Sequence, residues 1–471
     1  MCIRDRLKII GRAGVGVDNV DVPAATQRGV LVVNSPEGNT IAAAEHALAM
    51  MLSLSRHVPQ ANAGMRAGKW DRKKYVGNEL YKKTLGVVGL GKIGSHVAKV
   101  AQAMGMDVTA YDPFIAADRA KQMQVKLIEL DELFRTADYV TLHIPRTKDT
   151  ENLVNADLLR TMKPTARIVN CARGGVVDEA AIAEAIDNGV IAGAGLDVYA
   201  SEPLAEDSPL RAVERGLVLT PHLGASTEEA QENVAIDVAE QIRDVLLGLP
   251  ARSAVNIPGL SAEIMERLKP HLQLAETVGL LVSQLAGGHV KEMELRLQGE
   301  FASHPSQPLV IASLKGLLSA GLGDSINFVN ASLEAKARGI QVLEVKDESS
   351  RDFAGGSLQI TTRGDQGSRS VTGAVFADGD LRITSIDAFP VNVTPSSHML
   401  FTRHRDMPGI IGHLGSLLGE HNVNIASMQV GRKIVRGDAV MVLSIDDPIP
   451  ADLLQTITAI DGIQEAHPVT L

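Results

Sequence analysis

Over about the first 251 residues, short apolar runs alternate with helix-like segments. A strand that is covered on both faces reads as a continuous hydrophobic run. We therefore predict buried strands at residues 85–88, 107–111, 140–144, 167–170, 194–198 and 217–220. Apolar positions at helical spacing predict helices at residues 95–104, 178–188 and 227–247. Residues 40–55 predict a nearly all-apolar helix that is buried or lies at a subunit interface. The alternation favours the α/β class, with a Rossmann-like, doubly wound parallel sheet.

The pattern changes after a predicted linker at residues 253–259. A helix at 268–285 is followed by strand-like runs at 290–298, 340–346, 358–362, 371–376 and 381–386, which is typical of an α+β domain. The last segment, 397–471, reads β-α-β-β-α-β. Its strands are predicted at 399–403, 426–430, 439–444 and 463–468, and its helices at 409–421 and 451–459. This order is that of a ferredoxin-like module.

A glycine turn lies between the predicted strand 85–88 and the helix that follows it. Gly89, Gly91 and Gly94 form a G-x-G-x-x-G motif, and the next strand ends on Asp112. Such a turn lets a pyrophosphate approach the backbone at a helix N-terminus. The acid accepts hydrogen bonds from a ribose and repels a 2′-phosphate. The order of strand, glycines, helix, strand and acid therefore predicts an NAD site rather than an NADP site.

Composition narrows the class of protein further. The chain has 471 residues, of which 45% are hydrophobic, 22% charged and 3% aromatic. This length predicts about three domains with an aliphatic core. The net charge of −10 argues against a nucleic-acid or membrane surface. Only Cys2 and Cys171 are present, so neither a disulfide framework nor a thiolate metal site is expected. This cysteine usage fits a reducing cytoplasm. No apolar run reaches the ~20 residues of a membrane span, and the start MCIRDR does not read as a signal peptide.

Polar residues follow three successive predicted strands, where parallel strands line a ligand crevice. They are Arg173, Glu202 and His222. An arginine fork can hold a carboxylate, and a histidine can take a hydroxyl proton as a hydride leaves the carbon. A glutamate can orient that imidazole. Each residue alone also fits an ordinary loop or turn. Their joint placement after a dinucleotide motif favours a site that oxidises a hydroxy acid.

Several segments resemble the D-isomer-specific 2-hydroxyacid dehydrogenase family. The motifs are GRAGVGVDNVD (11–21), NSPEGNT (34–40), GLGKIG (89–94), VNCARGGVVDE (169–179), LDVYASEP (196–203) and PHLGAST (221–227). The appended regions are similar to those of long-form phosphoglycerate dehydrogenases. The resemblance implies a substrate-binding lobe at 1–35 plus 222–252 and an NAD-binding domain at 36–221. It also implies an intervening allosteric-substrate-binding domain at 260–390 and an ACT domain at 397–471.

The resemblance also assigns roles to single residues. It places the family's catalytic residues at Arg173, Glu202 and His222. It implies substrate contacts at Arg12, Asn39 and Arg72, the last donated by a neighbouring subunit. Cys171 is expected to pack rather than to act as a nucleophile, and Asp197 is expected to fix the nicotinamide carboxamide. Besides the three glycines, the implied NAD contacts are Lys92, Ile93, Asp112, Ile144, Cys171, Asp197, Gly224 and Ala225.

In the last module, the resemblance implies an effector site at His404, Asp406 and Asn424. Helix N–H groups would take the carboxylate of a small amino acid, and the Asp406 and Asn424 oxygens would accept bonds from its ammonium. The implied effector is L-serine. The alternative is a module kept for oligomer assembly, in which Asp406 is a helix cap.

Taken together, the resemblance implies NAD-dependent oxidation of 3-phospho-D-glycerate to 3-phosphooxypyruvate, the first step of L-serine biosynthesis. A homodimer or homotetramer is expected, with no metal. Two alternatives stay open: a hydroxypyruvate or D-lactate type dehydrogenase, and a non-catalytic amino-acid sensor. The family normally has a further segment before the RAGVGVDN motif, whereas MCIRDR matches nothing expected. We therefore expect an incomplete substrate-binding lobe and an unstable or inactive chain.

Overall fold

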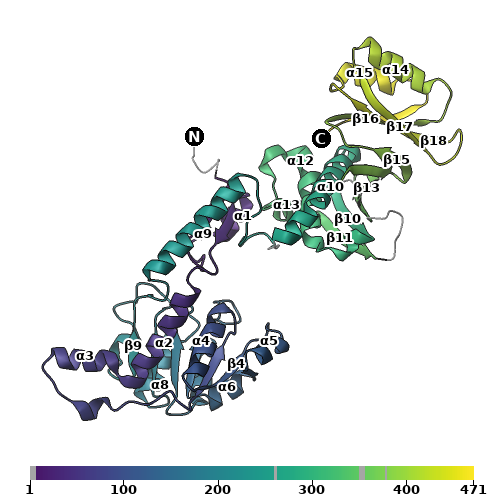
Figure 1. Cartoon of the computed structure of the whole chain (residues 1–471). Coiled ribbons are helices and arrows are strands. Elements are labelled where there is room, and N and C mark those ends of the chain that lie inside the picture. The colour runs from purple at the N-terminus through teal and green to yellow at the C-terminus, as the bar shows by residue number, and fades with distance from the viewer. Residues whose placement is uncertain (1–6, 259–261, 349–355, 377–378) are drawn as a thin grey trace. The chain divides into compact units, whose positions relative to one another are not determined.

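The computed structural model describes residues 7–258, 262–348, 356–376 and 379–471. Cys2 and the MCIRDR segment lie outside the described residues. The chain forms two compact units (Figure 1). The first unit contains Arg12–Val17 and Asn34–Glu240. The second unit contains residues 7–11, Asp18–Val33 and Gln241–Leu471. The predicted division into four domains is finer than this separation and stays a prediction.

The first unit is built on a seven-stranded sheet whose strands all pair in parallel. The order β5-β4-β3-β6-β7-β8-β9 reverses direction between β3 and β6, which makes this the topological switch point. The predicted Rossmann-like sheet is confirmed. Its strands are β3 (Thr84–Val88), β4 (Asp107–Tyr111), β5 (Lys126–Leu127), β6 (Tyr139–Leu142), β7 (Arg167–Asn170), β8 (Gly193–Leu196) and β9 (Leu217–Leu219).

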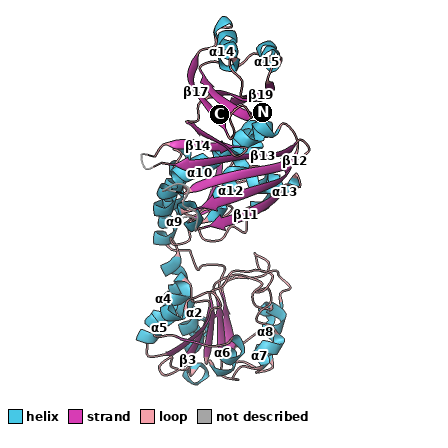
Figure 2. Cartoon of the chain, turned by 90° about the vertical axis from the view of Figure 1, so that its right-hand side faces the viewer, coloured by secondary structure: helices cyan, strands magenta, loops and turns pink. Residues whose placement is uncertain are grey.

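Helices cover both faces of this sheet (Figure 2). Val87 packs with α2 (Thr40–Arg56) and α4 (Lys92–Ala103), whereas its neighbour Val88 packs on the opposite side. That second face is covered by α6 (Leu130–Thr136), α7 (Ala156–Arg160) and α8 (Glu179–Asp187). Successive side chains of a strand point to opposite faces, so both sides are apolar.

The helix predicted at residues 40–55 is α2, and Ala44, Ala47 and Met51 on it are completely buried. The helix predicted at 95–104 begins earlier, at Lys92, directly in the glycine turn. The short helices of this unit were not predicted, because they have too few turns to show a clear hydrophobic period. The remaining elements of this region are α3 (Val58–Arg66), η2 (Arg72–Tyr75), α5 (Ala117–Gln122), η3 (Pro209–Ala212) and α9 (Glu228–Leu246).

The second unit begins with a small two-stranded sheet of β1 (Ile9–Arg12) and β2 (Leu31–Asn34), joined through α1 (Val22–Gln27). Asp21 caps α1 by accepting a 2.9 Å hydrogen bond from the Ala24 N–H. Ile9, Leu31 and Val33 form a separate small core. Among the helices of the described residues in either unit, none is both long and apolar enough to cross a bilayer.

The main body of the second unit is a six-stranded mixed sheet in the order β11-β10-β12-β13-β14-β15. β10 pairs with β11 in parallel, and the other pairs are antiparallel, which confirms the α+β prediction. The sheet packs against α10 (Ala262–Ala286) and α12 (Ser306–Leu322). The pattern of the sequence predicted β10 to β14 but not α12, nor the short elements α11, η4, α13 and β15. The remaining elements are β10 (Val290–Gln298), α11 (Glu300–Ser303), η4 (Gly323–Ser325), α13 (Ala331–Ala337), β11 (Gln341–Asp347), β12 (Ser357–Gly364), β13 (Gly367–Val375), β14 (Leu381–Ile386) and β15 (Phe389–Val393).

The chain ends in an antiparallel sheet of order β17-β18-β16-β19, with two helices on one face. The predicted ferredoxin-like order is confirmed. Its elements are β16 (His398–Arg405), α14 (Ile410–Glu420), β17 (Ile425–Arg432), β18 (Asp438–Ile445), α15 (Ala451–Thr458) and β19 (Ile463–Thr470).

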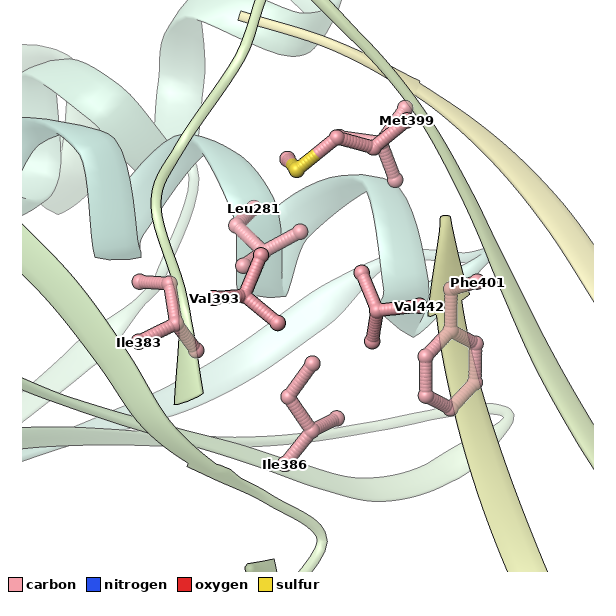
Figure 3. A pocket seen from close by; sticks show the side chains of 8 residues that line it. Leu281, Ile383, Ile386, Val393, Met399, Phe401 and Val442 are labelled. Atoms are coloured by element: carbon pink, nitrogen blue, oxygen red, sulfur yellow. The ribbon is translucent and has the colours of Figure 1, made fainter. Parts of the chain in front are cut away.

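The two central strands of this terminal sheet, β16 and β18, are buried on both faces. Leu400 and Leu443 pack under α14 and α15, whereas Phe401 and Val442 face the core of the six-stranded sheet. Figure 3 shows the contact, where Phe401 and Val442 lie with Leu281 of α10 around a small apolar cavity. Strands buried on both faces tie the terminal module to the preceding domain.

This packing makes Phe401→Ala strongly destabilising. Phe401 is 1% exposed. Its loss removes apolar contacts and enlarges a cavity, so we expect about 3–5 kcal/mol less stability in the second unit. The measurement is urea unfolding followed by circular dichroism. The matched control is Ile434→Ala, because Ile434 is 73% exposed on the same module; its effect should stay below about 0.5 kcal/mol. Equal effects of the two variants would contradict the packing.

Candidate active site

The glycine turn follows β3 at the switch point, and each glycine is there for a separate steric reason. Gly89 has φ 92°, and a Cβ there would lie 2.5 Å from the His143 carbonyl oxygen. A Cβ on Gly94 would lie 2.0 Å from the Gly89 carbonyl oxygen. A Cβ on Gly91 would meet no atom within 4 Å. The space above Gly91 is therefore open at the start of α4, as a pyrophosphate requires.

Asp112 lies at the end of β4, beside the glycine turn. Its carboxylate accepts hydrogen bonds from the backbone N–H groups of Leu90 at 2.8 Å, Phe114 at 2.9 Å and Ile115 at 3.2 Å. The first bond fixes the acid against the turn. The structure thus brings together the glycines and the acid that the sequence predicts for the ribose. These residues fit a dinucleotide without a 2′-phosphate.

The other predicted NAD contacts around the turn are partly exposed. Ile93 and Ile144 are half-buried, and Lys92 is exposed. Lys92 makes an ion pair with Glu37 of the NSPEGNT motif, and that contact lowers the pKa of Glu37.

The loop after β7 carries Arg173. Asn170 holds this loop by donating to the Arg173 carbonyl at 2.9 Å and accepting from the Ala172 N–H at 3.0 Å. The next residue, Gly174, packs so tightly that a Cβ there would lie 1.7 Å from the Tyr199 carbonyl oxygen. Arg173 itself is half-buried, and its Nη1 donates to the Ala172 carbonyl at 2.7 Å.

Glu202 and His222 come together from two different loops. Glu202 Oε2 lies 2.7 Å from His222 Nδ1. The Tyr199 N–H donates to the other carboxylate oxygen at 3.1 Å. His222 has φ 56°, a left-handed conformation that is uncommon for a residue with a side chain. This pair leaves His222 Nε2 as the ring nitrogen able to exchange a proton with a substrate.

Tyr199 contacts the backbone of the same region through its hydroxyl group. Its hydroxyl lies 2.8 Å from the Thr220 carbonyl and 3.0 Å from the Leu196 carbonyl. Burial raises the pKa of Tyr199 to about 12. The phenol therefore stays protonated at neutral pH and acts as a donor to these carbonyls.

Asp197 is completely buried beneath the loop that carries His222. Its Oδ1 accepts from the Thr220 hydroxyl at 2.6 Å and the Leu223 N–H at 2.7 Å, and its Oδ2 accepts from the Gly224 N–H at 2.8 Å. Burial raises the pKa of Asp197, but the hydrogen bonds outweigh burial and the net shift is downward. Asp197 is therefore ionised at neutral pH. Its contact with a nicotinamide carboxamide stays a prediction, as does the predicted contact of the half-buried Ala225.

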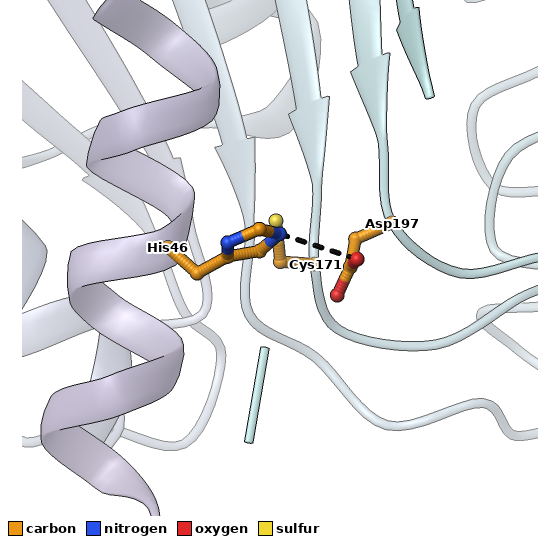
Figure 4. Close-up of side chains that lie close together, drawn as sticks. All are labelled: His46, Cys171 and Asp197. Carbon is orange, nitrogen blue, oxygen red and sulfur yellow. Dashed lines mark ion pairs between the residues drawn. The ribbon is translucent and has the colours of Figure 1, made fainter. Parts of the chain in front are cut away.

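His46, which the sequence pattern did not single out, reaches the same carboxylate from α2. Its Nε2 lies 3.2 Å from Asp197 Oδ1 (Figure 4). The one available signal was a histidine in an otherwise nearly apolar helix. His46, Cys171 and Asp197 have donor atoms within 4.8 Å of one another and are of types that bind zinc. However, Asp197 already accepts several hydrogen bonds, and burial raises the pKa of the Cys171 thiol. The geometry fits a hydrogen-bonded network better than a metal centre.

The predicted substrate residues all lie in the first unit. Arg12 is half-buried, donates to the neighbouring Ala13 carbonyl, and keeps its Nε buried without a described partner. Asn39 precedes α2 and likewise has its side-chain oxygen buried without a described partner. Arg72 is exposed in η2. Their roles in substrate binding stay predictions.

The predicted effector residues are already engaged within the terminal module. Asp406 accepts from Arg432 Nη1 at 2.9 Å and from the Arg436 N–H at 3.0 Å, and these bonds lower its pKa. Asn424 donates to Asp446 at 2.7 Å. His404 is 1% exposed, and burial lowers its pKa. A ligand at this site would therefore have to exchange with internal hydrogen bonds.

Comparisons with known proteins agree with this architecture. The family model "D-isomer specific 2-hydroxyacid dehydrogenase, NAD binding domain" matches residues 48–224. "D-3-phosphoglycerate dehydrogenase intervening domain" matches 267–387, and "ACT domain" matches 398–462. The chain is 63% identical over 467 residues to D-3-phosphoglycerate dehydrogenase of Synechocystis sp., covering 99% of this chain and 84% of the relative. The enzyme of that name from Archaeoglobus fulgidus is 44% identical, with 99% and 88% covered.

A solved structure extends the comparison. About half of the chain is similar to D-lactate dehydrogenase of Aquifex aeolicus in complex with NAD and lactic acid. The TM-score is 0.50 at 30% identity, covering 54% of this chain and 81% of that one. Fold and comparisons together define an NAD-dependent dehydrogenase of the D-isomer-specific 2-hydroxyacid class. The chain belongs to the D-3-phosphoglycerate dehydrogenase family, in the long form with an intervening domain and an ACT domain.

Proposed function

We propose that the protein oxidises 3-phospho-D-glycerate to 3-phosphooxypyruvate with NAD, the first step of L-serine biosynthesis. The observation that carries this proposal is the 2.7 Å Glu202–His222 pair at the carboxyl edge of the parallel sheet. The 63% identity to a protein named for this activity supports it. The open backbone above Gly91 and the acid at Asp112 fit the cofactor.

In this mechanism Arg173 holds the substrate carboxylate or the hydroxyl oxygen that becomes the carbonyl, because its guanidinium donates in a fork. His222 takes the hydroxyl proton at Nε2, since Nδ1 is bound to Glu202. NAD, when bound, supplies the acceptor for the hydride. Glu202 stabilises the imidazolium that results. We assign the substrate phosphate to Arg12 and Arg72, with Arg72 acting across a subunit interface.

We further propose that the ACT module binds a small amino acid, L-serine, in a homo-oligomer. Asp406 and Asn424 flank α14 on either side in the sequence, and their oxygens suit an ammonium group. The match to the ACT family model supports this assignment. Binding would replace the Arg432–Asp406 ion pair, so the two states would differ in this contact.

One assay tests both proposals. NADH formation is measured with 3-phospho-D-glycerate, D-lactate and D-glycerate, each with and without L-serine. We expect kcat/KM for the phosphorylated substrate to exceed the others by about 100-fold or more, because only that substrate offers a phosphate to the guanidinium groups of Arg12 and Arg72. Equal values would favour a D-lactate type dehydrogenase. Calorimetry tests the remaining alternative, because binding of serine without binding of NADH would indicate a non-catalytic sensor.

A further inference from the structure

We propose that His46 is a positioning residue for the reaction. Its imidazole holds the buried Asp197 carboxylate, and that carboxylate fixes the loop that carries His222. The inference rests on the proposed function for its kinetic consequence, but the hydrogen-bonded geometry stands without it.

The geometry joins three elements that are distant in sequence. His46 lies on α2, Asp197 follows β8, and Thr220 follows β9. His46 Nε2 is 3.2 Å from Asp197 Oδ1 and 3.2 Å from Thr220 Oγ1. The carboxylate is 0% exposed, so its hydrogen-bond donors come from the protein. Figure 4 shows the imidazole reaching from the helix toward the acid, beside Cys171.

The network fixes which nitrogen of His46 carries a hydrogen. An ionised Asp197 can only accept hydrogen bonds. The Thr220 hydroxyl has one hydrogen, and it donates that hydrogen to Asp197 in the 2.6 Å bond. Both neighbours of Nε2 therefore present lone pairs, and Nε2 has to be the protonated nitrogen. This assignment holds for the neutral ring and for the imidazolium. His46 thus acts as a hydrogen-bond donor and not as a base.

Asp197 passes this constraint to the catalytic loop through three consecutive residues. The His222 N–H donates to the Asp197 backbone carbonyl at 2.9 Å. The N–H groups of Leu223 and Gly224 donate to the two carboxylate oxygens at 2.7 and 2.8 Å. These bonds hold His222 at a left-handed φ of 56°, which needs local support. Loss of a donor on Asp197 would loosen this loop.

The carboxylate depends on His46 because burial opposes its charge. Burial raises the pKa of Asp197, and the hydrogen bond from His46 lowers that pKa more than any other contact does. The Cys171 thiol and the Tyr199 phenol also face Asp197, and neither is charged at neutral pH, since burial raises the pKa of both. Without His46 the pKa of Asp197 would rise, and its hold on the loop would fail at a higher pH.

The test compares His46→Leu, which removes the donor, with His46→Gln, whose amide restores an N–H at similar reach. Glu45→Gln is the matched control, because Glu45 is the exposed neighbour on α2. Hydrogen exchange of the Leu223 and Gly224 amides reports the loop directly. We expect His46→Leu to speed exchange about 10-fold or more, with kcat falling about 10- to 100-fold and substrate KM little changed. The acid limb of kcat/KM should move to higher pH. His46→Gln should restore most of each value.

Each outcome decides the proposal. Unchanged exchange in His46→Leu, or equal loss in the Leu and Gln variants, would overturn it. If the folded chain neither binds NADH nor turns over any of the hydroxy acids, the proposed function fails. The exchange comparison would still decide the role of His46. Urea unfolding of each variant separates a loosened loop from global destabilisation.

Discussion

His222→Gln is expected to lower kcat about 10³-fold while leaving the affinity for NADH nearly unchanged. A glutamine amide has no basic lone pair, so the substrate hydroxyl loses its proton acceptor. The Glu202–His222 pair lies after β8 and β9, whereas the glycine turn follows β3, so the cofactor side stays intact. The measurements are single-turnover NADH absorbance and NADH fluorescence titration.

Glu202→Gln is the graded control for this prediction. It keeps a side chain at hydrogen-bond distance from His222 Nδ1 but removes the charge that stabilises the imidazolium. We expect a smaller loss of kcat, about 10²-fold, with a shifted pH profile. An unchanged kcat in His222→Gln would remove His222 as the base, and a larger effect in Glu202→Gln than in His222→Gln would reverse the assigned roles.

Substitutions of two glycines in the same turn should impair the protein for different reasons. Gly91→Ala adds a Cβ that meets no atom within 4 Å, so the fold should be unaffected. The methyl group would, however, occupy the open space expected for the pyrophosphate. We expect the NADH dissociation constant to rise about 10-fold or more, with little change in the midpoint of urea unfolding.

Gly94→Ala should show the opposite pattern. Its Cβ would lie 2.0 Å from the Gly89 carbonyl, so α4 has to move away from β3. Overpacking of this kind costs about 1–3 kcal/mol or more, which urea unfolding of the first unit would detect. NADH binding should fall as a consequence. If Gly91→Ala proves as destabilising as Gly94→Ala, the cradle described at the switch point is wrong.

Most of the fold could be predicted because its elements follow from local patterns of hydrophobic and polar residues. Parallel strands buried on both faces give continuous apolar runs. The β-α-β-β-α-β order of the last module can be read directly from the order of its elements along the chain. Helices were not predicted where the hydrophobic residues show no helical period. Helix α12 is buried nearly all round, so it has no polar face to mark it. Short helices such as α7 give too few turns.

The site was predictable to the same extent. The glycine motif, Asp112, and the polar residues after successive strands stand out because parallel strands end at one edge of the sheet. His46 did not stand out. Its partner Thr220 lies 174 positions away, and no local rule connects a helix histidine with a strand end at that distance. Likewise, the sequence did not indicate that Asp406 and Asn424 already have internal partners.

The amino-acid sequence by itself determined the class of sheet, the order of the domains, the cofactor turn and the residue types that suit a hydroxy-acid dehydrogenase. Those features depend on neighbours in the chain and on the period of each element. Only the tertiary structure decided which groups touch. It placed Glu202 2.7 Å from His222, buried Asp197 beneath that histidine's loop, and brought His46 from α2 to support it. The physical reason is that these contacts join loops and helices from distant parts of the chain, and packing of the whole unit fixes their distances.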